Sequence, residues 1–90
     1  MLKNHMEVLI DRHLPSLIEE GSHLKECDIC QNDVKAIALN HLKPQYIVTT
    51  RGRIFTQLKE LDLQFQSDII QELVRAISLV EGNPHHEEEA

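Results

Sequence analysis

Apolar residues recur at steps of three and four along the first twenty residues, with polar residues between them. These apolar positions are Met6, Leu9, Ile10, Leu14, Leu17 and Ile18. The spacing places them on one face of a helix, so the pattern predicts a helix over residues 3–20. Pro15 has no N–H to donate, and we expect either a kink or the start of a short second helix there. Gly21 and Ser22 are expected to end the segment.

A second amphipathic pattern follows a polar connection over residues 22–29. Its inward positions are Val34, Ile37, Ala38 and Leu42. The pattern predicts a helix from Asp28 or Cys30 to Leu42, which Pro44 stops because the residue before a proline avoids helical geometry.

The stretch after this helix, residues 45–50, is rich in β-branched side chains and predicts a short extended segment. Residues 51–53, Arg-Gly-Arg, are a turn candidate, after which Ile54 and Phe55 are expected to pair back onto the extended piece.

Helical periodicity returns from Thr56 to Glu81. Its apolar positions are Leu58, Leu61, Phe65, Ile69, Leu73, Ile77 and Val80. Ser67-Asp68 is typical of a helix start, so we expect two helices broken near Gln66, with Gly82 as the final stop.

The pattern as a whole predicts one mainly α domain over residues 1–82. It is a small bundle of about four helices with one short extended segment between the second and third. Residues 83–90 are expected to form a disordered acidic tail.

The apolar fraction is 41%, but the chain has only two Phe, one Tyr and no Trp. A core of this size built from aliphatic side chains is marginal, so a metal or a second copy of the chain would add stability. We therefore expect a homodimer.

The formal net charge of −6 argues against direct nucleic-acid binding, which requires a broad basic face. No apolar run is long enough to span a membrane, and Glu7 interrupts the position of a signal-peptide core. These features favour a cytoplasmic protein without a membrane partner.

Cys27 and Cys30 form a Cys-x-x-Cys motif. In the cytoplasm this spacing indicates a zinc half-site, a redox pair or two unligated thiols, rather than a structural disulfide. His23 is the nearest candidate for a third zinc ligand, and His13, His41 or a second subunit would have to supply the fourth.

Asp33 and Asn40 are seven residues apart and so share one face of the predicted second helix. Together they are able to contact a nucleobase edge. The alternative is structural, with Asp33 interacting with the helix dipole and Asn40 with local backbone.

Arg51 and Arg53 flank a glycine, and arginine is suited to phosphates because it offers a planar fork of donors. Simple solvation of both side chains is the alternative. The chain has no phosphate-binding glycine loop and no nucleophile–base set, so we expect no enzymatic activity.

One longer motif carries a family resemblance. The run C-x-x-C-x-x-D-V-x-A-x-A-L-N-x-L-x-P-x-Y, from Cys27 to Tyr46, resembles the late competence protein ComFB family. The resemblance implies a helical, dimeric, non-enzymatic domain, and some family members hold zinc with more cysteines than this chain has.

The resemblance also implies a receptor for a cyclic dinucleotide, cyclic di-GMP or cyclic di-AMP, that regulates competence or motility. The residues implied to face the ligand are Asp33, Asn40 and Tyr46, to which the residue pattern adds Arg51 and Arg53. Cyclic di-GMP is slightly favoured because guanine N–H donors pair with a carboxylate.

Two functions therefore remain open. The first is a second-messenger receptor that passes its signal to a downstream protein partner. The alternative is a metal-stapled protein–protein interaction domain without a small ligand.

Overall fold

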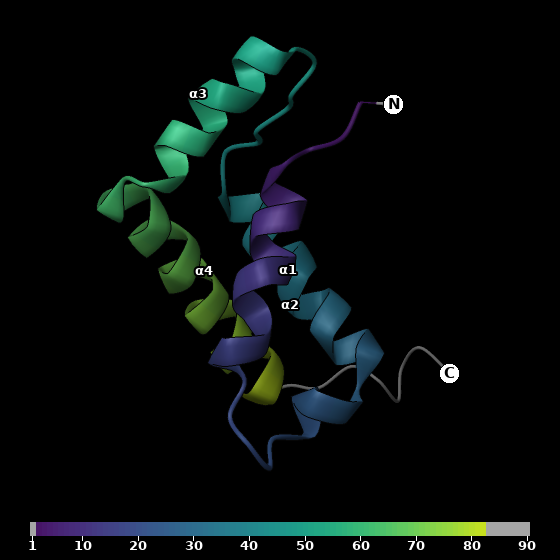
Figure 1. Cartoon of the computed structure of the whole chain (residues 1–90). Coiled ribbons are helices and arrows are strands. Elements are labelled where there is room, and N and C mark those ends of the chain that lie inside the picture. Colours follow the sequence, from purple (N-terminus) through teal and green to yellow (C-terminus); the bar gives the residue numbers. More distant parts are fainter. Residues whose placement is uncertain (1, 83–90) are drawn as a thin grey trace.

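The computed structural model describes residues 2–82 and confirms the mainly α fold (Figure 1). One short 3-10 helix, η1, precedes the second of four α-helices in the described chain. In order, the elements are α1 (Met6–Leu17), η1 (His23–Glu26), α2 (Asp28–His41), α3 (Thr50–Glu60) and α4 (Leu63–Gly82). The predicted acidic tail lies outside the described residues.

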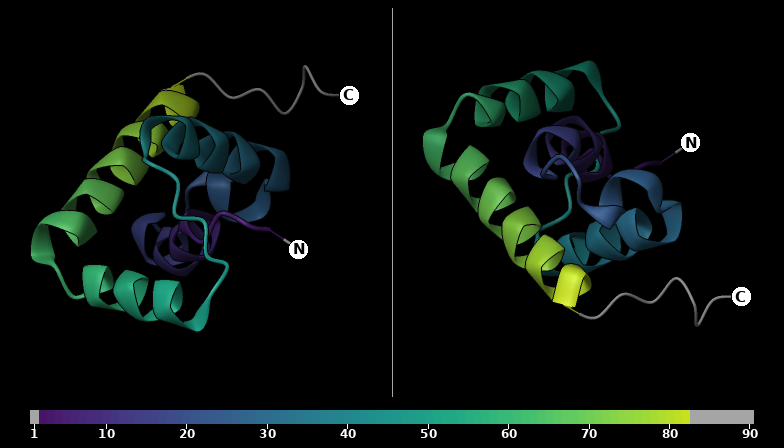
Figure 2. Two further views of the ribbon diagram at one scale, coloured as in Figure 1. Left: turned by 90° about the horizontal axis from the view of Figure 1, so that it is seen from above. Right: turned by 90° about the horizontal axis from the view of Figure 1, so that it is seen from below.

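The core forms where α2 packs against α4, with α1 in contact with both. In Figure 2, α1 lies within the angle between α3 and α4, and α2 lies on its other side. The fully buried side chains from these helices include Leu9, Ile10, Val34, Ile69 and Leu73. They occupy the three- and four-residue steps that the sequence predicts, so the core faces of α1, α2 and α4 are confirmed.

The first helix is shorter than predicted. Pro15 lies inside α1, which ends two residues later at Leu17, and no second helix starts at Pro15. Ile18 has extended backbone angles, and Gly21 then adopts a φ of 86°, in the left-handed region that glycine tolerates without strain. The chain therefore reverses here, and the Ser22 side chain accepts a hydrogen bond from the Leu24 N–H at the start of η1.

The predicted turn at residues 51–53 is wrong, because these residues belong to the first turns of α3. Thr49 Oγ1 accepts a hydrogen bond from the Gly52 N–H at 3.0 Å, which satisfies an N–H that has no partner inside the helix. Ile54 and Phe55 are helical and do not pair back. The extended segment instead forms an isolated antiparallel bridge between Tyr46 and Asn4.

The predicted break near Gln66 is also misplaced, since α3 ends at Glu60 and α4 begins at Leu63. Asp62 Oδ1 accepts hydrogen bonds from the N–H groups of Gln64 at 2.8 Å and Phe65 at 3.3 Å. Asp62 therefore caps the start of α4, and Ser67 lies inside that helix. No helix in residues 2–82 has the length and apolar character needed to cross a membrane.

Candidate functional site

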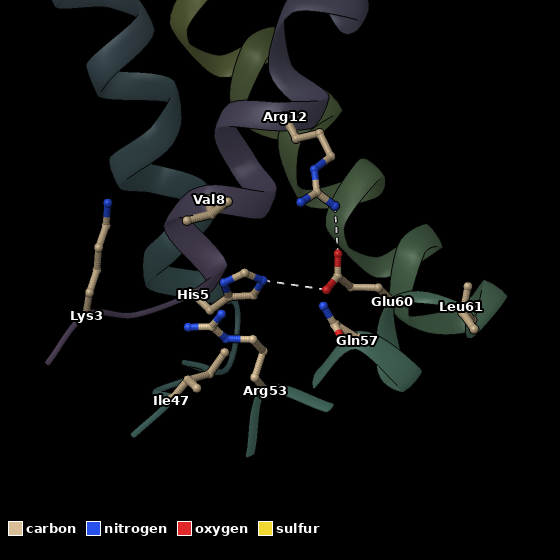
Figure 3. A pocket seen from close by; sticks show the side chains of 9 residues that line it. All are labelled: Lys3, His5, Val8, Arg12, Ile47, Arg53, Gln57, Glu60 and Leu61. Atoms are coloured by element: carbon tan, nitrogen blue, oxygen red, sulfur yellow. Dashed lines mark hydrogen bonds and ion pairs between the residues drawn. The ribbon is translucent and has the colours of Figure 1, made fainter. Parts of the chain in front are cut away.

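A hollow of about 560 Å³ opens between the N-terminal part of α1 and one face of α3 (Figure 3). The segment before α1 and the extended segment after α2 complete its wall. Its lining residues are Lys3, His5, Val8, Arg12, Ile47, Arg53, Gln57, Glu60 and Leu61. We refer to this hollow as the α1–α3 groove.

Glu60, the last residue of α3, is the groove residue that pairs with side chains within and directly before α1. Its Oε1 is 2.6 Å from Arg12 Nη1, and its Oε2 is 3.6 Å from His5 Nε2. Figure 3 shows both side chains directed at this carboxylate. The Glu60 side chain is 19% exposed and the Arg12 side chain is 57% exposed, so solvent screens part of this contact. It holds one end of α3 against α1.

The groove is basic although the chain is acidic. Lys3, Arg12 and Arg53 contribute three permanent positive charges, against the single carboxylate of Glu60. Arg12 is paired with Glu60, whereas Lys3 and Arg53 are exposed and make no ion pair with any described residue. Two cations thus remain available to an anionic ligand.

The N-terminus of α3 adds to the positive charge of the groove. A helix N-terminus carries a partial positive charge and is stabilised by acidic side chains. The first turn of α3 has no acidic residue and instead contains Arg51, with Arg53 following directly. Like charges meet at this end of the helix, and an anion near Arg53 would relieve their repulsion.

The structure brings only part of the predicted ligand set together. Arg53 lines the groove, and Tyr46, which is 58% exposed, immediately precedes the lining residue Ile47. Arg51 is exposed but does not line the groove.

Asp33 and Asn40 also lie outside the groove, on α2. Asp33 is half-buried, and its Oδ2 is buried with no hydrogen-bond partner in the described part of the chain. Asp33 also follows the first turn of α2, where Asp28 is the acidic residue, so the dipole explanation applies to Asp28 instead. Asn40 is exposed, one residue before the end of α2.

Four groove residues were not predicted from the sequence: Lys3, His5, Arg12 and Glu60. No local pattern marks them, because Arg12 and Glu60 are 48 residues apart and meet only through the tertiary fold. A weak signal was present in α3, where Arg53, Gln57 and Glu60 recur at helical spacing on one polar face.

The cysteines do not fit a zinc site. Cys27 Sγ accepts a hydrogen bond from the Cys30 N–H at 3.3 Å and so caps α2. Cys30 is fully buried in the core. No group of three potential metal-binding side chains from His, Cys, Asp or Glu occurs within residues 2–82, so His23 does not complete a site there. A closed zinc site needs four ligands.

Comparisons with known proteins agree on one family. The family model described as late competence development protein ComFB matches residues 3–84. Competence protein ComFB of Bacillus subtilis (strain 168) is 26% identical over 84 residues, covering 93% of this chain and 86% of that protein.

A solved structure is also similar. The structure described as the structural characterization of the late competence protein ComFB from Bacillus subtilis has a TM-score of 0.70 and 27% sequence identity. The match covers 93% of this chain and 92% of that chain.

Proposed function

This chain belongs to the late competence protein ComFB family, and we propose that it is a non-enzymatic receptor for a cyclic dinucleotide. The observation that carries the proposal is the α1–α3 groove, with two unpaired cations, Lys3 and Arg53, at its wall. A volume of about 560 Å³ lies within the range typical of small-molecule sites.

Each part of the groove corresponds to a part of the ligand. Arg53 and Lys3 neutralise phosphates, and Arg53 adds a planar face that stacks on a purine. Ile47 and Val8 supply apolar surface for the ring system, whereas Tyr46 is exposed and does not line the groove. These groups are ones that an anionic, aromatic ligand would use.

Among the cyclic dinucleotides, we propose cyclic di-GMP ahead of cyclic di-AMP. Guanine offers N1–H and amino donors, and these pair with a carboxylate acceptor. Asp33 is outside the groove, so Glu60 is the carboxylate available there. Its hydrogen bond to Arg12 holds the carboxylate in place.

We further propose that the receptor is a homodimer formed through α3. The side of α3 opposite its packed side exposes a row of large apolar residues that continues through the connection to the first residue of α4. These residues are Ile54, Phe55, Leu58, Leu61 and Leu63, each more than half exposed. Contiguous apolar surface of this kind marks an interaction site.

A second copy is the occupant that suits this row best. The row runs along one helix, so two copies of α3 related by a two-fold axis present the same apolar surface to each other. The groove adjoins the row at Leu61, which belongs to both. Cyclic di-GMP has approximate two-fold symmetry, so it suits a dimer with a two-fold axis.

Calorimetric titration of the full chain with cyclic di-GMP and cyclic di-AMP tests the proposal. We expect saturable binding that Arg53→Ala weakens at least about tenfold, because one charge-assisted contact is worth roughly 1.5–3 kcal/mol. Arg75→Ala is the matched control, since Arg75 lies on α4 outside the groove.

Absence of binding for both dinucleotides would overturn the receptor proposal. If α3 nevertheless associates with another protein, the interaction domain becomes the better description. The apolar row on α3 would then be its contact surface, and no metal would be needed for it.

A further inference from the structure

The two cysteines differ in position and exposure, and the proposed receptor function uses neither. Cys27 is the residue that caps α2, with a φ of −117° and a ψ of 100°, outside helical geometry. It is partly exposed. Cys30 lies three residues further along, inside the first turn, and is fully buried. Cys27 is therefore a partly buried residue at the edge of the core, whereas Cys30 belongs to the core itself.

Capping brings the two residues close. Cys27 Sγ is 3.3 Å from the backbone nitrogen of Cys30. The Cys30 sulfur is only three bonds from that nitrogen, so rotation about its Cα–Cβ bond moves it toward Cys27 Sγ. Residues three apart in a helical turn have Cα atoms about 5 Å apart, within the range of roughly 4.4–6.8 Å found in disulfides.

We propose that Cys27 and Cys30 form a reversible dithiol–disulfide pair, with Cys27 as the attacking thiol and Cys30 as the resolving thiol. The oxidant we name is a low-molecular-weight disulfide of the glutathione class. The arrangement of a partly exposed capping cysteine before a buried one allows the two steps to occur in order.

The chemistry balances over those two steps. Cys27, as its thiolate, attacks one sulfur of the small disulfide, forms a mixed disulfide and releases the first small thiol. The Cys30 thiolate then attacks Cys27 Sγ, forms the Cys27–Cys30 bond and releases the second small thiol. The small disulfide gains two electrons, and the two protons lost by the protein thiols appear on the two released thiols.

Closure of this bond needs no movement between helices. Both sulfurs belong to the first turn of α2 and the residue before it, while the Cys27 N–H is bonded to the carbonyl of Leu24 in η1. We therefore expect the helical content of the protein to be the same in both redox states. The inference is independent of the receptor proposal, because neither cysteine lines the groove.

The experiment treats the full chain with glutathione disulfide, quenches with acid and measures intact mass. The wild type is expected to lose two hydrogens and carry no glutathione. It should also resist alkylation by iodoacetamide under denaturing conditions until dithiothreitol restores both thiols. A wild-type protein that keeps both thiols free, or accumulates glutathione on Cys27, would overturn the proposal.

Single-cysteine variants assign the two roles. Cys30→Ala is expected to accumulate one glutathione on Cys27, because no resolving thiol remains. Cys27→Ala is expected to react at least about tenfold more slowly, since reaching Cys30 requires local opening of the helix. Equal rates for the folded variants would contradict the assignment.

Cys30→Ala removes side-chain volume from the core. Cys30→Val is therefore a second variant, because valine is apolar and similar in size to cysteine. The Val variant is expected to trap glutathione on Cys27 just as the Ala variant does. In concentrated denaturant, Cys27→Ala and Cys30→Ala should react alike, because the difference between them comes from burial. If the two variants reacted at unequal rates in denaturant, burial of Cys30 would not be the cause of the difference.

Discussion

Arg12 Nη1 and Glu60 Oε1 are 2.6 Å apart, although 48 residues separate them in the chain. The contact joins α1 to the last residue of α3 and forms one wall of the α1–α3 groove. It is one of few contacts between α3 and the rest of the fold, because the only buried side chain of α3 is Thr56. The ion pair therefore matters more for the position of α3 than for the core.

We expect Glu60→Gln to loosen α3 while leaving the core intact. The substitution removes the carboxylate that pairs with Arg12, and partly exposed pairs of this kind are worth less than about 1 kcal/mol. Amide hydrogen exchange should become faster in α3 and remain unchanged in the buried part of α4. Glu72→Gln is the control, because its pair with Arg75 lies within α4. Unchanged protection of α3 in Glu60→Gln would show that other contacts hold it.

Arg51 and Arg53 are expected to contribute unequally to ligand affinity. Only Arg53 lines the groove, so Arg53→Ala should weaken cyclic dinucleotide binding by about tenfold or more, and Arg51→Ala by much less. Calorimetry on both variants and on the double variant measures the difference. An equal loss in the two single variants would place the ligand across the N-terminus of α3 instead of inside the groove.

Asp33→Asn is expected to leave affinity for both cyclic dinucleotides unchanged. Asp33 lies on α2, outside the groove, and its substitution nearly preserves side-chain shape. Helix content, followed by circular dichroism, should also stay constant. A selective loss of cyclic di-GMP affinity would return Asp33 to the guanine-contacting role that the sequence resemblance implies.

The apolar row on α3 is expected to hold two copies of the chain together. Phe55→Asp places a charge where the side chain is 62% exposed, so it should abolish association without unfolding the monomer. Light scattering should give twice the mass of 10.4 kDa for the wild type and the monomer mass for the variant. Val74→Asp, on α4, is the matched control. A monomeric wild type over a wide concentration range would refute the dimer.

The two cysteines are expected to differ in their effect on stability. Cys27→Ser replaces the capping sulfur with an oxygen at a position where serine is among the preferred residues, so the free energy of unfolding should stay the same or rise. Cys30→Ser places a hydroxyl in the core and should lower that free energy by about 1–3 kcal/mol. Urea denaturation of the two variants checks both values, and a larger loss for Cys27→Ser would contradict the capping role.

Sequence periodicity was sufficient for the three helices that build the core. Leu9, Val34 and Leu73 lie at positions whose three- and four-residue spacing requires a buried face, so their burial follows from local pattern. The helix ends were harder to predict from the sequence, because they depend on which of several neighbouring residues caps the helix. Thr49 caps α3, although Gly52 had suggested a turn there. Asp62 caps α4, although Ser67 had suggested a later helix start.

The amino-acid sequence by itself determined the helical class, the core faces and the family, because each depends on residues that lie within a few turns of one another. Only the tertiary structure decided the groove, the partner of Glu60 and the exposure of the α3 apolar row. Residues distant in the chain, such as Arg12 and Glu60, meet there through packing of whole helices. Periodicity identifies an apolar face, as on α3, but only packing against the other helices decides whether that face is covered.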